Sequence, residues 1–146
     1  MVTLQGPFLL DKKMKPKFKS QYHHAHIYFD SATLSKAKAL HQKLSTQKKW
    51  KLQISELIGK PIGPHPVPMF EADFLTDDFE DFVTYLNENR DGLSILVHPV
   101  TEEEVLDHTS RATWLGESLE LDIGFLEKFM AGKVASVQAT LHKNKN

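Results

Sequence analysis

Cysteine is absent from this chain of 146 residues. The absence excludes disulfide bonds, thiolate metal ligands and a cysteine nucleophile, so a metal site in this protein must use histidine, carboxylate and water. A chain without cysteine also suits a reducing compartment, and we therefore predict a cytoplasmic protein.

Long apolar runs and a strong net charge are also missing. No stretch approaches the ~20 apolar residues of a membrane span, and residues 1–7 are too polar to predict a signal peptide. The formal net charge of −1 gives no electrostatic reason to expect a nucleic-acid partner. Hydrophobic residues at 40% and charged residues at 25% are ordinary for a globular protein, so we predict one domain with its own core.

Histidine is where the sequence becomes informative, above all in residues 22–30, Tyr-His-His-Ala-His-Ile-Tyr-Phe-Asp. Aromatic and β-branched residues predict a strand, in which successive side chains alternate between faces. One face then carries the polar rings of His24, His26 and Tyr28. The other face, which suits packing under helices, carries Ala25, Ile27 and Phe29. Two histidines on one strand face can both bind a metal ion, or one can bind while the other moves protons; the alternative is a solvent-exposed polar face.

The remaining elements follow from periodicity and capping signals. Strands are predicted over residues 50–55, 69–74 and 93–99, and helices over 31–43, from Thr76 to Leu86, after 101–104 and over 122–130. Residues 112–116 are predicted to form a loop. The resulting order is β-α-β-β-α-β with a C-terminal extension, which is the ferredoxin-like α+β arrangement. We predict a basic arm over 1–20, a single domain over 21–131 and a C-terminal tail over 132–146.

This topology predicts a cluster of histidines. We expect the first and third strands to lie side by side and parallel, with the fourth antiparallel on the other side of the first. His24, His65 and His98 would then share one end and one face of the sheet, opposite the helices. Neighbouring strands are ~4.8 Å apart, so three rings can surround one ion with bonds of ~2.0–2.1 Å. His26 replaces His24 if the register differs by two; otherwise it acts on a ligand bound at the metal.

With these residues identified, the sequence resembles the DOPA 4,5-dioxygenase family of small aromatic ring-opening dioxygenases, from about Tyr22 to Ile123. The blocks that carry the resemblance are His24–Asp30, Gly63–Pro66 with Met69–Phe70, Asn89–Pro99, Asp107–Thr109 and Trp114–Gly116.

The resemblance implies a ferredoxin-like fold paired into a homodimer, with residues 21–131 as the catalytic domain. It also implies non-haem iron(II), with zinc as an alternative metal in isolated protein. The implied reaction is extradiol cleavage of a catechol such as L-DOPA with O₂. The ring-opened product is a precursor of betalain-type pigments.

We assign hypothetical roles accordingly. His24, His65 and His98 form the leading ligand set, and His26 or His108 is the base that takes a catechol proton. A two-histidine, one-carboxylate site remains an alternative, in which Asp107 is a candidate unless it orients His108. Glu71 is on the right face but is expected to lie too far along its strand.

Substrate contacts are assigned in the same way. Tyr28 donates a hydrogen bond to the substrate, and Arg90 or Arg111 binds a substrate carboxylate. Trp114 stacks on the aromatic ring, with a core position as its alternative. Two other functions remain open: a zinc-dependent hydrolase or isomerase, and a non-catalytic dimer that binds a small aromatic ligand on the open sheet face.

Overall fold

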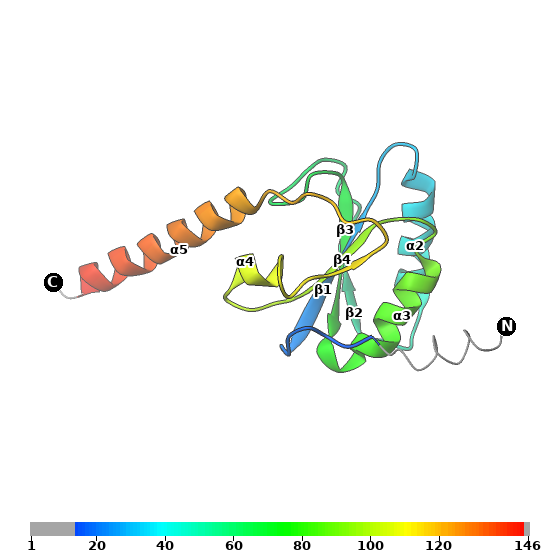
Figure 1. Ribbon diagram of the computed structural model, residues 1–146, viewed down its shortest axis with the longest axis horizontal. Coiled ribbons are helices and arrows are strands. Elements are labelled where there is room, and N and C mark those ends of the chain that lie inside the picture. Colours follow the sequence, from blue (N-terminus) through cyan, green and yellow to red (C-terminus); the bar gives the residue numbers. More distant parts are fainter. Residues whose placement is uncertain (1–13, 145–146) are drawn as a thin grey trace.

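The computed structural model describes residues 14–144, so most of the predicted basic arm lies outside the described residues. The elements in order are β1 (Tyr22–Tyr28), α2 (Leu34–Thr46), β2 (Leu52–Ile54), β3 (Met69–Leu75), the 3₁₀ turn η1 (Thr76–Asp78), α3 (Phe79–Asn89), β4 (Ile95–Pro99), α4 (Glu104–Asp107), β5 (Thr113–Leu115) and α5 (Ile123–Asn144). The first six major elements reproduce the predicted β-α-β-β-α-β order (Figure 1). The ferredoxin-like α+β class is therefore confirmed.

The sheet has five strands in the order β2-β3-β1-β4-β5, and every neighbouring pair is antiparallel. β1 pairs with β3 such that Tyr22 lies opposite Leu75 and Tyr28 lies opposite Met69. The expected parallel pairing of the first and third strands was therefore wrong. Helix α2 connects β1 to β2 across a space that is one strand wide. Strand β3 lies in that space and runs antiparallel to both β1 and β2.

Residues 113–115 form an edge strand, although a loop was predicted there. Thr113 lies opposite Val97 and Leu115 lies opposite Ile95, so β5 extends the sheet beyond β4. Three residues are too few to show an alternating pattern in the sequence, and this strand exists only because β4 offers it a partner.

One face of the sheet is covered by α2 and α3, whereas α4 and α5 lie on the other side (Figure 1). The β1 side chains that point toward α2 and α3 are Ala25 and Ile27, both fully buried, followed by Phe29. They belong to the main core together with Leu40 of α2 and Phe82 of α3. The predicted apolar face of the first strand is thus confirmed.

The opposite face of β1 is not exposed to solvent as a polar surface. His26 is 3% exposed and Tyr28 is also 3% exposed, because α4, the chain after β5 and the start of α5 cover this side. A second, smaller apolar cluster closes one end of this face. Its buried members are Tyr28, Met69, Leu96 and Ala112.

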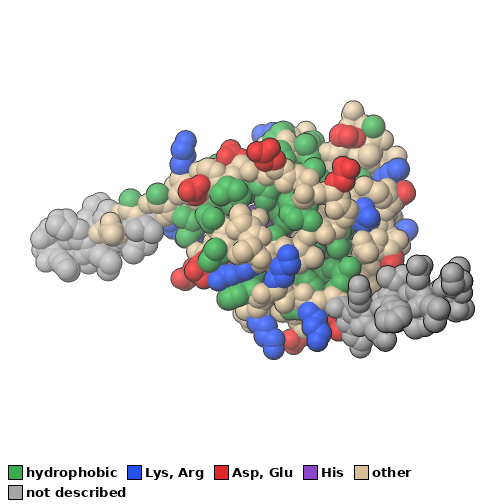
Figure 2. Space-filling view, viewed as in Figure 1, with side chains coloured by type: hydrophobic (Ala, Val, Ile, Leu, Met, Phe, Trp, Pro, Cys, Tyr) green, Lys and Arg blue, Asp and Glu red, His purple; other side chains and the backbone are tan. Residues whose placement is uncertain are grey.

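Helix α5 is longer than the predicted helix over 122–130 and continues through residues for which a tail was predicted. Figure 1 shows that it projects away from the body, and Figure 2 shows hydrophobic side chains gathered where it leaves. Leu126 is buried, whereas Phe125 and Phe129 are 43% and 47% exposed. Within the described residues, no helix combines the length and the apolar character that crossing a membrane requires.

Replacement of Phe82 by alanine is expected to lower the free energy of unfolding by about 3–5 kcal/mol, because it leaves a cavity in the core. The Phe82 ring is fully buried, with its centroid 4.7 Å from that of Phe74. Leu75→Ala, at a 44% exposed position, should change the value by no more than about 0.5 kcal/mol. Urea denaturation measures both variants, and equal stabilities would contradict this placement of the core.

Candidate metal centre

Five histidines gather on the face of the sheet that α2 and α3 leave uncovered. They come from β1 (His24 and His26), the loop before β3 (His65), β4 (His98) and the residue after α4 (His108). The ring centroids of His26 and His65 are 4.1 Å apart, those of His98 and His108 are 4.0 Å apart, and those of His26 and His98 are 5.0 Å apart. All five rings line one cavity of about 260 Å³.

His65 reaches this cluster by a route that differs from the predicted one. Because β3 runs antiparallel to β1, the residues that precede Met69 lie at the Tyr28 end of β1. The loop turns back over the sheet, with Gly63 at a φ of 57° and the His65 amide donating to the Ile62 carbonyl at 3.0 Å. Its ring therefore meets the other histidines from the opposite end of the strand.

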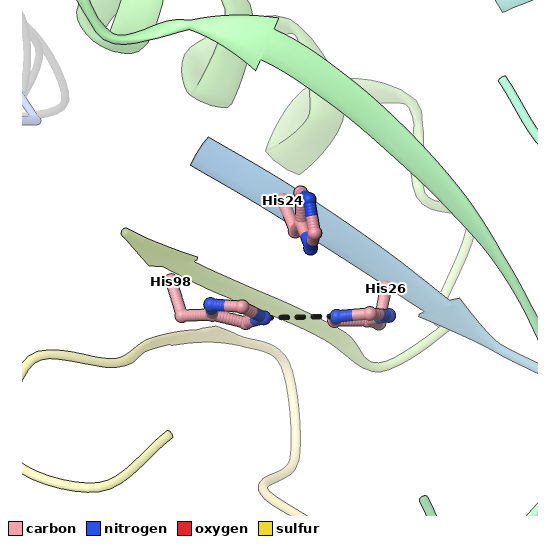
Figure 3. Close-up of side chains that lie close together, drawn as sticks. All are labelled: His24, His26 and His98. Carbon is pink, nitrogen blue, oxygen red and sulfur yellow. Dashed lines mark hydrogen bonds between the residues drawn. The ribbon is translucent and has the colours of Figure 1, made fainter. Parts of the chain in front are cut away.

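His26 belongs to both of the possible metal-binding groups that consist of histidines alone. In the described part of the chain, ligand atoms lie within 4.8 Å of one another in three groups: His24–His26–His98, His26–His65–His108 and His24–Glu71–Asp73. The predicted combination of His24, His65 and His98 is not among these groups. In Figure 3 the rings of His26 and His98 meet edge to edge, with their Nε2 atoms 2.9 Å apart, and His24 lies beside them.

Backbone carbonyls fix the proton positions on two of these rings. The Nδ1 of His98 lies 2.7 Å from the Pro99 carbonyl oxygen, and the Nδ1 of His108 lies 2.7 Å from that of Glu104. A carbonyl oxygen only accepts, so both rings carry hydrogen on Nδ1 and, when neutral, present Nε2 as a lone pair. The orienting partner of His108 is thus the Glu104 carbonyl, and not Asp107, which the sequence had offered as an alternative to its role as a ligand.

This assignment also determines the state of His26. Since Nε2 of His98 accepts, Nε2 of His26 must donate to it. Nδ1 of His26 is then a buried acceptor with no hydrogen-bond partner among the described residues. Such buried, unsatisfied groups are rare in folded proteins, and each calls for an explanation.

Burial keeps the imidazoles of His26, His65 and His98 neutral. It lowers the pKa of His26 and of His98 well below the ordinary 6.5, and neighbouring histidines lower both further. Burial lowers the pKa of His65 to about 4. Neutral imidazole is the form that binds metal ions, so the cluster is in a metal-binding state at neutral pH.

Tyr28 and Trp114 lie side by side near the cavity. Their ring centroids are 5.9 Å apart with planes at 23°, and the Tyr28 hydroxyl lies 2.7 Å from Nδ1 of His65. Trp114 packs against the smaller apolar cluster and does not line the cavity of the histidines. The alternative of a core position therefore describes Trp114 better than stacking on a substrate.

Neither predicted arginine lines this cavity. Arg90 donates to the Leu93 carbonyl at 3.3 Å and closes the turn after α3. Arg111 forms ion pairs with Glu103 at 2.8 Å and with the buried Asp107 at 3.2 Å. Their charges are used within the fold, which the sequence alone did not indicate.

Glu71 belongs to the site, although it was expected to lie too far away. The antiparallel register places it directly opposite His26, and its Oε1 lies 3.7 Å from Nδ1 of His26 and 3.5 Å from Nδ1 of His24. Burial and the neighbouring Asp73 raise the pKa of Glu71 to about 8. The alternation over residues 69–74 had put Glu71 on the correct face, and the expected strand direction put it at the wrong position.

Phe125 and Phe129 also line the cavity, and sequence reasoning gave neither a role. Their rings lie 6.4 Å apart with planes at 14°. The loop of His65 and the start of α5 are joined by a hydrogen bond from the Asp122 amide to the Pro64 carbonyl at 2.8 Å. This tertiary contact leaves no local signal in the sequence.

The sequence matches a family model described as "Dopa 4,5-dioxygenase family" over residues 23–125, which contain all five histidines of the cluster. A solved structure from Nostoc punctiforme, described as a "putative dioxygenase", superimposes with a TM-score of 0.71 at 40% identity. That similarity covers 75% of this chain and 93% of the other.

Two curated proteins are similar over shorter regions. An uncharacterised 21.2 kDa protein of Botryotinia fuckeliana is 42% identical over 92 residues, covering 58% of this chain and 50% of that protein. A DOPA 4,5-dioxygenase of Amanita muscaria is 46% identical over 66 residues, covering 45% of this chain and 29% of that protein. The chain thus spans half or less of the length of these curated relatives.

The cluster predicts that the protein binds one divalent transition metal ion per chain through His26. His26→Ala should weaken binding by more than the about 10–100-fold that changes to outer residues cost. His41→Ala is the matched control, because His41 lies outside the cavity with Nε2 2.9 Å from the Ser55 carbonyl oxygen. Calorimetric titration with cobalt(II) measures both variants, and equal losses of affinity would count against the site.

Proposed function

This chain belongs to the Dopa 4,5-dioxygenase family, and from that premise we propose that it opens the aromatic ring of a catechol such as L-DOPA with O₂ by extradiol cleavage. The observation that carries the proposal is the buried cluster of neutral histidines around His26, which faces a cavity large enough for one small ring.

We propose iron(II) as the metal and His24, His26 and His98 as its ligands. Imidazole nitrogens suit iron(II) as ligands. The Nε2 lone pair of His98 already points toward Nε2 of His26, which lies 2.9 Å away (Figure 3). When bound, iron(II) supplies open coordination positions and electron transfer between an aromatic ring and O₂. This set replaces His65 of the predicted combination with His26.

The hydrogen bond of Tyr28 argues against His65 as a ligand. Burial raises the pKa of Tyr28, so its hydroxyl keeps its hydrogen, and we propose that it donates this hydrogen to Nδ1 of His65. In that tautomer His65 carries hydrogen on Nε2, and it is a hydrogen-bond donor rather than a metal ligand. Tyr28 thus acts through His65, in place of the substrate contact expected from the sequence.

His108 and His65 have different roles toward the substrate. The Nε2 lone pair of His108 makes it the base that takes a proton from a catechol hydroxyl. The proton that His108 takes is the one that returns to the product, and the neutral His65 contributes a hydrogen bond from Nε2 to an oxygen of the substrate. Their ring centroids are 6.2 Å apart, and both rings line the cavity.

Apolar side chains of α5 complete the substrate site. Phe125 and Phe129 expose their rings at the cavity, and an aromatic substrate ring would stack on or against them. Phe125 and Phe129 thus have the stacking role that the sequence analysis assigned to Trp114. A homodimer, a cytoplasmic location and a role in forming betalain-type pigments remain predictions from the family resemblance.

A second candidate function follows from the same cluster. Three histidines with an open coordination position also suit zinc, and a zinc-dependent hydrolase or isomerase would use His108 as its base equally well. Consumption of O₂ distinguishes the two functions.

Anaerobically iron(II)-loaded protein should consume O₂ when given L-DOPA and form a yellow ring-opened product. Oxygen uptake and visible absorbance measure the reaction. His98→Ala and zinc-loaded protein should both be inactive, whereas His41→Ala should retain activity. The absence of uptake with L-DOPA and simple catechols, despite one bound metal per chain, would exclude the proposed dioxygenase.

His108→Ala should keep the metal while kcat falls about 10²–10⁴-fold, because the base is lost and the proposed ligands remain. Metal content by elemental analysis and oxygen uptake are measured on the same sample. Loss of the metal together with activity would instead favour the second group, His26, His65 and His108, as the ligands.

A further inference from the structure

His26 holds its ring hydrogen on the wrong nitrogen for the role that the proposed function gives it. Without a metal ion, its Nε2 donates to His98. A metal ion bound at Nε2 requires the lone pair there, so the hydrogen must move to Nδ1. That atom is buried, and none of the described residues hydrogen-bonds to it.

The nearest carboxylate to this nitrogen is Glu71. Its Oε1 lies 3.7 Å from Nδ1 of His26, beyond a hydrogen bond but within reach of a small side-chain rotation. The side chain of Glu71 is 28% exposed, so it has room to rotate, whereas that of His26 is 4% exposed and held among other rings.

The register of β1 and β3 supports this pairing. His26 lies opposite Glu71, and His24 lies opposite Asp73, whose Oδ1 is 3.3 Å from Nε2 of His24. His24 and His26 thus each lie opposite an acidic residue of the neighbouring strand, and Oε1 of Glu71 lies between the two rings, 3.5 Å from Nδ1 of His24. Metal-binding histidines generally donate their second ring nitrogen to a carboxylate or carbonyl, which fixes the tautomer and the ring orientation.

We propose that Glu71 is a positioning residue that accepts the Nδ1 hydrogen of His26 and so directs Nε2 of His26 to the metal ion. The proposal rests on the proposed metal-dependent function. It accounts for the unpartnered nitrogen of His26, because Glu71 satisfies that atom in the metal-bound state. The carbonyl groups of Pro99 and Glu104 likewise accept the Nδ1 hydrogens of His98 and His108.

The test measures cobalt(II) affinity by calorimetry and the visible spectrum of the bound cobalt, both independent of catalysis. Glu71→Ala should bind cobalt about 10–100-fold more weakly and with a shifted spectrum. Glu71→Gln should restore much of the affinity, since its amide oxygen also accepts a hydrogen bond. Glu88→Ala, which removes an exposed carboxylate on α3, is the matched control and should bind as the wild type does.

Each other outcome has a definite meaning. Wild-type affinity and spectrum in Glu71→Ala would overturn the proposal. An equally large loss in Glu71→Gln and Glu71→Ala would make Glu71 a direct ligand and would also overturn it. The melting temperatures of the metal-free variants show whether a substitution weakens binding through misfolding. If Glu71→Ala misfolds, the cobalt affinity of Glu71→Gln alone decides the test. Failure of the wild type to bind cobalt would refute the proposed function itself.

Discussion

The two-residue alternation of β1 is the constraint on which both the core and the site depend. β1 is hydrogen-bonded on both sides, to β3 and to β4, so its side chains cannot change faces without a slip of both pairings. Ala25 and Ile27 are held in the core, and His24 and His26 are held on the opposite face. A slip by one residue would turn His24 and His26 toward the phenylalanines of the core and disperse the candidate metal centre.

The histidine cluster is costly as a purely structural feature. Burial of several imidazoles leaves polar atoms that must find partners, and one nitrogen of His26 finds none in the described chain. Backbone carbonyls orient His98 and His108, and Tyr28 orients His65, so the rings are fixed before any ligand arrives. Such preorganisation is what a metal site with a separate base and a separate hydrogen-bond donor requires.

Local patterns in the sequence predicted which residues share a face, but not how distant segments meet. The alternation of β1, the stripe of α3 and the gathering of histidines from separate segments could be predicted, because each follows from side-chain periodicity within one element or from the order of elements. The direction of β3 could not be read from its own residues. That one error placed His65 at the wrong end of the sheet and moved Glu71 away from His26, its actual neighbour.

The ligand set also needed three-dimensional information. His24 and His26 are equivalent in an alternating strand, and the structure distinguishes them by the greater burial of His26 and by its 2.9 Å contact with Nε2 of His98. The central claim is that His26 binds the metal through Nε2, between β1 and β4. Anomalous diffraction at the iron edge from crystals of iron(II)-loaded protein tests it directly. The account predicts one anomalous peak about 2 Å from Nε2 of both His26 and His98. A peak among His24, Glu71 and Asp73, with His26 outside the coordination sphere, would contradict it.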